Sequence, residues 1–182
     1  VSANPAPAIR RRRLHSHQGR HMLCTIAQSF TRPANTTGYT AADLVANDVD
    51  AADVTPLTWG INHFGKSGFY IRAARLYKSS TTVTAASFKL HLFTASPGVP
   101  TNGDNGALAV ASAADFLDSI AIDLSSGAFV GTAGVSKRSA ASAIGVWLPP
   151  GSNQVFGLLE ALGAYAPASG ETFRVTLECE VA

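Results

Sequence analysis

Charged residues, cysteines and long apolar runs are all scarce in this 182-residue sequence, and each absence excludes something. Only 14% of residues are charged, which is unusual for a soluble helical enzyme. Two cysteines are too few for a disulfide framework, and no stretch reaches the roughly 18 apolar residues of a membrane helix. No apolar segment follows the N-terminal arginines, so no secretory signal is visible. We therefore expect cytoplasmic synthesis and no membrane partner.

What the sequence does contain is enough apolar material for one continuous core, since 46% of its residues are hydrophobic. The clearest strand lies at the C-terminus, where apolar and polar residues alternate from Phe173 to Val181. A second alternation runs from Phe88 to Phe93 and places His91 on the polar side. Cys24 and Cys179 lie near opposite ends of the chain; we interpret them as buried thiols that could pair only if the first and last strands are neighbours.

These patterns predict an all-β fold, an antiparallel β-sandwich of about eight strands with a jelly roll as the favoured topology. Residues 22–182 form this single domain. The polar stretch from Lys78 to Thr82 predicts a hairpin between its flanking strands Tyr70–Tyr77 and Val83–Phe93. One short helix is expected at Ala111–Leu117. The remaining strands are expected at Cys24–Thr31, Val54–Ile61, Ser119–Leu124, Gly145–Leu148 and Gln154–Leu162.

An extended basic arm precedes the predicted domain. Residues 1–21 contain five arginines and no acid, so the arm carries +5 and the rest, with nine basic and twelve acidic residues, carries −3. One interpretation is a solvated tail; the other is an arm that docks on an acidic partner or on nucleic acid. Nucleic acid is the weaker choice, because no second basic stripe with interleaved aromatics follows. The candidate partner-binding residues are Arg10, Arg11, Arg12, Arg13 and Arg20.

The segment Gly60–Ser67 matches the phosphate-loop pattern G-x-x-x-x-G-K-[ST], and the apolar run ending at Asp123 resembles the magnesium-binding strand that accompanies it. A phosphate loop requires a strand before it and a helix after it. Here Gly68 and the β-favouring residues Phe69, Tyr70 and Ile71 follow instead. We therefore interpret the segment as a loop between strands and predict no cofactor.

Other candidate chemistry is equally incomplete. His15, His17, His21 and Cys24 match no standard zinc spacing. A group of aspartates lacks the glycine and the closing glutamate of a calcium loop, so turn carboxylates are the simpler interpretation. The predicted domain has no nucleophile elbow to accompany its two histidines, and its carboxylates have no defined geometry for glycoside hydrolysis. The aspartates of this group are Asp48, Asp50 and Asp53, and the two histidines are His63 and His91. We therefore predict that the protein is not an enzyme and has no metal site.

Five further segments form a pattern that the residue-by-residue reading does not explain: Val54–Leu57, Ile71–Ser79, Val83–Thr84, Phe88–Phe93 and Asn102–Gly106. Through these segments the chain resembles small structural proteins of tailed bacteriophages, in particular head decoration, or cement, proteins. The resemblance covers roughly Gly38 to Ala182, leaves the arm outside, and is a general pattern rather than a diagnostic signature.

The resemblance implies a sandwich on the virion surface that binds the major capsid protein at junctions between capsomers and resists the pressure of packaged DNA. It also implies a homo-oligomer, a dimer or trimer, since capsid sites have such local symmetry. Two other functions remain open: a tail-associated carbohydrate- or receptor-binding module, and a nucleotide-binding or hydrolytic enzyme. Of the large side chains, Trp59, Phe64, Phe69, Trp147 and Phe156 are candidates for core or for contact surface, and we favour core for each.

Overall fold

The computed structural model describes residues 22–61, 68–98, 100–141, 145–150 and 152–181. These residues form two antiparallel sheets, with a single 3-10 helix at Ala51–Asp53. The strands are β1 (Met22–Thr31), β2 (Leu44–Val45), β3 (Leu57–Gly60), β4 (Phe69–Lys78), β5 (Ser87–Phe93), β6 (Phe116–Asp123), β7 (Phe129–Gly131), β8 (Gly134–Ala140), β9 (Val146–Leu148), β10 (Gln154–Ala161) and β11 (Thr172–Val181).

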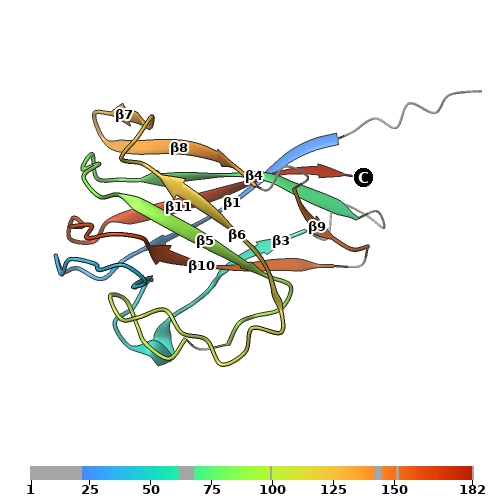
Figure 1. Cartoon of the computed structure of the whole chain (residues 1–182), viewed down its shortest axis with the longest axis horizontal. Helices are drawn as coiled ribbons and strands as arrows, with labels where there is room; N and C mark the ends of the chain where they lie inside the picture. Colours follow the sequence, from blue (N-terminus) through green and yellow to red (C-terminus); the bar gives the residue numbers. More distant parts are fainter. Residues whose placement is uncertain (1–21, 62–67, 99, 142–144, 151, 182) are drawn as a thin grey trace, which may run out of the picture.

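The strand pairing is nested from the outside of the chain inwards. β1 pairs with β11, β2 and β3 pair with β10, β4 pairs with β8 and β9, and β5 pairs with β6. One sheet has the order β1-β11-β4-β8-β7 with β9 beside β4, and the other has the order β2-β10-β5-β6 with β3 beside β10. This is a long antiparallel hairpin rolled into two facing sheets, as Figure 1 shows, which is the topology of a jelly roll.

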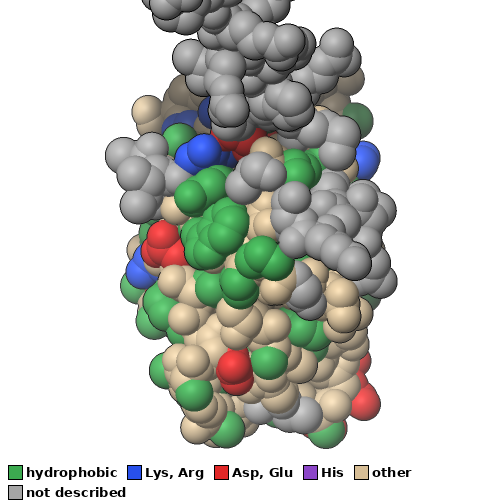
Figure 2. All heavy atoms as spheres, turned by 90° about the vertical axis from the view of Figure 1, so that its right-hand side faces the viewer, with side chains coloured by type: hydrophobic (Ala, Val, Ile, Leu, Met, Phe, Trp, Pro, Cys, Tyr) green, Lys and Arg blue, Asp and Glu red, His purple; other side chains and the backbone are tan. Residues whose placement is uncertain are grey.

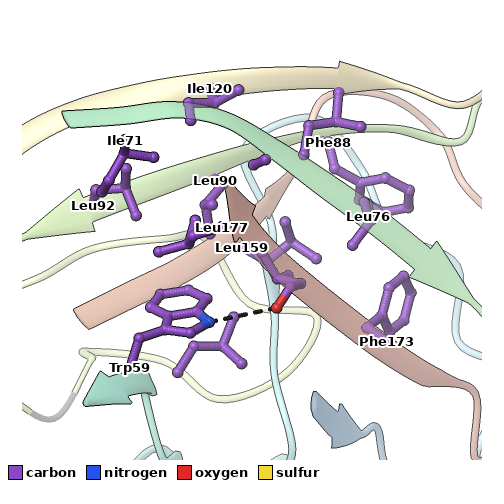
Figure 3. Close-up of a cluster of buried hydrophobic side chains, with 14 of the residues drawn as sticks. Trp59, Ile71, Leu76, Phe88, Leu90, Leu92, Ile120, Leu159, Phe173 and Leu177 are labelled. Atoms are coloured by element: carbon purple, nitrogen blue, oxygen red, sulfur yellow. Dashed lines mark hydrogen bonds between the residues drawn. The ribbon is translucent and has the colours of Figure 1, made fainter. Parts of the chain in front are cut away.

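The core lies between the sheets and is built from the inward-facing residues of both. Trp59 from β3 is its largest fully buried side chain and donates a hydrogen bond from Nε1 to the Val175 carbonyl oxygen of the opposite sheet, 3.4 Å away (Figure 3). A Cβ on Gly157 would lie 2.8 Å from the Trp59 ring, so only glycine fits the strand that passes this indole. The other residues labelled in Figure 3 come from both sheets and fill the space around it.

The two clearest alternating patterns are confirmed. In β11, Phe173, Val175, Leu177 and Cys179 are buried, and in β5 the same holds for Phe88, Leu90 and Leu92. His91 lies on the outer side of its strand, as expected, and its Nε2 is 2.6 Å from a carboxylate oxygen of Glu160 on β10. The period-two pattern therefore assigned each residue to the correct face.

The predicted hairpin between Tyr70–Tyr77 and Val83–Phe93 is wrong. β4 lies in the six-stranded sheet between β11 and β8, whereas β5 lies in the other sheet between β10 and β6. The intervening segment is a connection that crosses from one sheet to the other. A short polar loop indicates where the chain reverses, but it does not fix whether the next strand pairs with the previous one or packs across the core from it.

The predicted helix at Ala111–Leu117 is also wrong. The chain makes a turn, in which the Phe116 amide donates to the Ala113 carbonyl oxygen, and then enters β6 at Phe116. Pairing of Phe116 with Phe93 extends the β5–β6 ladder and outweighs the helical preference of a few alanines. Three strands were not predicted at all: the two-residue β2, and β7 and β8, which lack a clear apolar alternation.

The outer faces of the two sheets differ in how far other parts of the chain cover them. Over the five-stranded sheet, loop residues pack on a second small cluster that includes Phe93 and Leu158. Within the described residues, no comparable second cluster lies over the six-stranded sheet, where charged and polar side chains face outwards. The six-stranded sheet therefore presents the open face of the molecule.

Candidate binding face

Arginines from three adjacent strands meet on this open face. Arg72 and Arg75 come from β4, Arg138 from β8 and Arg174 from β11, and each occupies a position at which its strand points away from the core. We call these four residues, together with Glu178 and Glu180 of β11, the arginine face. The β-ladder places Arg75 opposite Arg138 and diagonally from Arg174, because outward positions on neighbouring strands lie side by side.

The carboxylates of the face are outnumbered by the guanidinium groups. Glu178 accepts from Arg75 at 3.1 Å and from Arg138 at 2.6 Å, and Glu180 accepts from Arg72 at 2.6 Å. Burial raises the pKa of Glu178, but the hydrogen bonds from Arg138 and Arg75 more than offset it and hold the pKa below its usual value. Among the described residues Arg174 has no carboxylate partner. The face therefore retains a net charge of +2, from four arginines and two glutamates.

The arrangement contains a like-charge contact that sheet stability does not favour. Arg75 and Arg138 are direct cross-strand partners, and like charges in that position are destabilising. Residues 22–182 carry a net charge of −3 in total. Because the arginine face contributes +2, the other residues of this range carry −5. Positive charge is thus concentrated on one sheet of an otherwise acidic body, which is suited to an acidic partner surface.

A shallow groove of about 580 Å³ runs over the same face. Its lining combines arginines with small hydroxyl side chains: Thr25, Ser29, Arg75, Tyr77, Thr172, Arg174, Thr176 and Glu178. The Tyr77 hydroxyl already donates to the Ala133 carbonyl oxygen at 3.0 Å, whereas Arg75 and Arg174 are both exposed and can still donate to a ligand. Such a lining can bind carboxylates or hydroxyl groups.

An aromatic pair borders the arginine face at the end where β9 lies beside β4. Trp147 and Tyr70 are cross-strand partners with ring centroids 4.7 Å apart, and the Arg72 guanidinium lies 4.4 Å from the Tyr70 ring centroid. Trp147 is 42% exposed, which overturns the expectation that it belongs to the core. Figure 2, which looks at the end that carries β9 in Figure 1, shows hydrophobic side chains gathered beside basic and acidic ones.

A buried polar network lies at the opposite end of the sandwich, where the β1–β2, β4–β5 and β10–β11 connections lie side by side (Figure 1). Its first half is centred on Arg32, which donates to the Tyr39 hydroxyl at 2.9 Å and to an Asp104 carboxylate oxygen at 3.0 Å. Asp104 also accepts from Tyr39 at 2.6 Å and from the Ala46 amide at 2.9 Å. The side chains of Arg32 and Asp104 are 0% exposed.

The second half joins Lys78, Tyr165 and Glu171. Lys78 donates to the Tyr165 hydroxyl at 3.0 Å and to Glu171 at 3.2 Å, and Tyr165 donates to Glu171 at 2.6 Å. Burial lowers the pKa of Lys78 and raises that of Tyr165. Tyr39 stacks on Tyr165 with ring centroids 6.2 Å apart, which connects the two halves. We call these six residues the loop clamp.

The loop clamp has the composition of an acid–base site but not the access. Lys78 and Glu171 are both 0% exposed, so a substrate cannot reach the ammonium or the carboxylate in this structure. Every member instead holds a connection between strands. Gly103 illustrates how closely the loops approach, because a Cβ there would lie 2.0 Å from the Val49 carbonyl oxygen. The clamp is a structural element.

The residues nominated from the sequence are placed unevenly. The five arm arginines, His15, His17, His21, His63 and Phe64 lie outside the described residues. In the segment that matches the phosphate-loop pattern, Gly60 ends β3, and after the motif the chain enters β4 at Phe69 rather than a helix. Asp123 accepts from the Ser125 amide and hydroxyl in a turn. Asp48 and Asp50 also cap local turns, the second at the 3-10 helix.

The two cysteines are direct cross-strand partners, since β1 and β11 are neighbours. Both are free thiols; Cys179 is buried, as predicted, and Cys24 is partly exposed. The Cys24 thiol lies 3.6 Å from the Cys179 carbonyl oxygen. Burial is the main cause that raises the pKa of each thiol, so both are held in the protonated, less reactive form.

Neither the arginine face nor the loop clamp was identified from the sequence. Arg75, Arg138 and Arg174 are far apart in the chain, and only the strand order brings them together. One signal was available: Arg174 and Glu178 stand on the polar side of the predicted C-terminal strand. The charged residues of the clamp are isolated and lie beside turns, a pattern that is typical of surface residues. The neighbouring sequence gives no indication that they are buried.

Comparison with known proteins gives no family for the chain. A scan against protein-family models and a search of curated proteins both find no match. Among the helices of the described residues, none is long and apolar enough to cross a bilayer. Those residues also contain no group of three or more histidine, cysteine or acidic side chains placed to hold a metal ion.

Proposed function

We propose that the protein is a non-enzymatic virion structural protein of a tailed bacteriophage that decorates the head. In this proposal it binds the outer surface of the major capsid protein, through the arginine face and the basic arm, and stabilises the capsid. The observation that carries the proposal is the concentration of positive charge on one open sheet, where Arg75 and Arg138 stand opposite each other and Arg174 has no acidic partner within the described residues. The phage context rests on the sequence resemblance.

The jelly-roll architecture supports this function because it provides a broad, rigid binding surface. The sheet holds the outward residues of β4, β8 and β11 in fixed register. Their backbone is therefore already ordered before binding, and little of its conformational entropy is lost when an acidic partner binds. The loop clamp holds the connections at one end. A protein that must resist outward pressure on a shell benefits from such rigidity.

The experiment mixes purified protein with undecorated capsids of the encoding phage, pellets them, and counts bound copies per capsid as salt is raised. We expect saturation at a fixed copy number, with binding that weakens as salt screens the charges. The double substitution Arg75→Glu and Arg174→Glu should abolish or strongly weaken it. The matched control is Lys89→Glu on the outer side of the other sheet, where Lys89 lies 3.6 Å from Glu160.

Deletion of residues 1–20 separates the two contributions. If the arm docks on the capsid, the deletion lowers affinity and reduces the salt dependence, while the arginine face still gives a fixed copy number. No loss of binding on deletion contradicts a docking role for Arg10, Arg11, Arg12, Arg13 and Arg20. No binding of the intact protein to capsids contradicts the decoration function itself.

A second candidate function, a tail-associated carbohydrate- or receptor-binding module, is favoured by the aromatic pair. Trp147 offers an exposed ring beside Tyr70 and Arg72, and sugar rings bind on such surfaces through their apolar faces. The variant Trp147→Ala separates the functions. It should leave capsid binding intact under the decoration proposal and should remove glycan binding, measured on an array of host surface glycans, under the alternative.

A further inference from the structure

The edge strand β1 differs from the other edges of the two sheets. β7, at the opposite edge of the same sheet, has three residues, and β2 and β3 have two and four. β6 is longer but contains Asp118 and Asp123. β1 has ten residues, Met22–Thr31, without a charge, proline or glycine. Short or charged edges discourage pairing between molecules, so β1 is the edge left available for it.

The direction of the backbone groups of β1 follows from its pairing with β11. The Arg32 amide donates to the Glu171 carbonyl oxygen at 3.0 Å, which makes residues 32 and 171 a hydrogen-bonded pair. Because such pairs alternate along an antiparallel ladder, the even-numbered residues of β1 bond to β11. The N–H and C=O groups of five residues therefore point away from the sheet: Leu23, Thr25, Ala27, Ser29 and Thr31. Among the described residues no backbone partner contacts them.

We propose that two copies of this chain pair through β1 around a two-fold axis at Ala27. In the antiparallel register centred there, Leu23 lies opposite Thr31 of the second copy, Thr25 opposite Ser29, and Ala27 opposite itself. This register uses all five outward residues of each strand, whereas a register shifted along β1 leaves some of them unpaired. The strand is thus complementary to itself, and β1 contains no charged residue that would oppose pairing with a second β1.

The surroundings of the edge are compatible with a second strand. Beside residues 28–31 a groove of about 290 Å³ separates β1 from the segment 55–58. At the other end Leu23 is 77% exposed and would be covered in part by the second copy. The side chains at the centre of the register are small, with Ala27 flanked by Thr25 and Ser29. Pairing would join two six-stranded sheets into one and place the two arginine faces side by side.

This inference deepens the proposed function, because it gives the expected homo-oligomer a surface, but the dimer is tested without capsids. Sedimentation velocity over a range of concentrations should show a monomer–dimer equilibrium. Ala27→Pro removes an outward N–H and leaves the bonds to β11 intact, so it should weaken the dimer about tenfold or more. The matched control Ala27→Val keeps the N–H and should still dimerise. A wild-type protein that stays monomeric, or a dimer that Ala27→Pro does not weaken, overturns the proposal.

The register has its own test, which also serves if the proline variant fails to fold. Ala27→Lys and Ala27→Glu each place like charges opposite one another at the axis, so each variant alone should dimerise more weakly than the wild type. A mixture of the two should form mainly the mixed dimer, measured by native mass spectrometry. A random mixture of dimers overturns the register centred on Ala27. The wild-type protein could instead be monomeric while Ala27→Pro loses capsid binding. That result would overturn the dimer but not the decoration function, and it would indicate that a strand of the capsid protein pairs with β1.

Discussion

The loop clamp and the arginine face use the same chemistry in opposite environments. Both pair basic side chains with carboxylates at 2.6–3.2 Å. In the clamp the paired side chains are 0% exposed, whereas Arg75 and Arg138 are half exposed. A buried charge that loses its partner cannot regain water, while an exposed one can. The clamp therefore bears on folding and the face on binding, and substitutions can test this division.

The largest effect is expected for Asp104→Ala. The substitution leaves the Arg32 guanidinium buried without its carboxylate and removes the acceptor of the Tyr39 hydroxyl and the Ala46 amide. Loss of one partner of a buried pair costs about 3–5 kcal/mol of unfolding free energy. Urea unfolding followed by tryptophan fluorescence measures it. The control is Asp50→Ala, whose carboxylate caps an exposed turn; equal losses in the two variants would contradict the distinction between clamp and surface.

A smaller loss is expected for Glu171→Gln, since glutamine can still accept from Tyr165. The variant removes the negative charge beside the buried Lys78 ammonium. Burial already lowers the pKa of Lys78, and the nearby glutamate opposes that shift, so the variant should lower this pKa further. Between this lowered folded pKa and the usual value of 10.5, the unfolded chain binds more protons than the folded one, so stability should rise with pH over that interval. Urea midpoints across this range would contradict the account if they were flat.

At alkaline pH, ionisation of the clamp tyrosines should dominate the pH dependence of the unfolding free energy. Burial, followed by the charge of Asp104, raises the pKa of Tyr39, and burial raises that of Tyr165. A raised folded pKa gives stability that is fully present below the unfolded value near 10 and is lost as pH rises above it. Unfolding at high pH should therefore coincide with a step in phenolate absorbance. Tyr39→Phe should reduce the size of that step, and a variant with an unchanged step would show that Tyr39 ionises while folded.

The same contrast explains what the sequence could predict. Period-two alternation identified β5 and β11 because each has one buried and one solvated side, and the nested pairing agrees with the expected jelly roll. Alternation does not encode strand partners, which is why β4 and β5 were assigned to a hairpin. Nor does it identify single buried charges such as Arg32 or Lys78, whose partners are distant in the chain. The arginine face required the strand order, because its members become neighbours only across β11, β4 and β8.

The smallest effect on stability, and the sharpest test of the division, is expected for Glu178→Gln. Burial raises the pKa of this carboxylate, but hydrogen bonds from Arg138 and Arg75 outweigh burial and lower the pKa. The lowered pKa stabilises the folded state above the usual value of 4.5, and this stabilisation is lost as pH falls through the folded pKa. Because both arginines are half exposed, the loss at neutral pH should stay within about 1 kcal/mol. The face changes from +2 to +3, so capsid binding should strengthen and depend more steeply on salt. The pelleting assay and urea unfolding, run on the same variant, measure both quantities. Reduced capsid binding, or a loss as large as that of Asp104→Ala, would show that Glu178 belongs with the structural pairs rather than with the binding face.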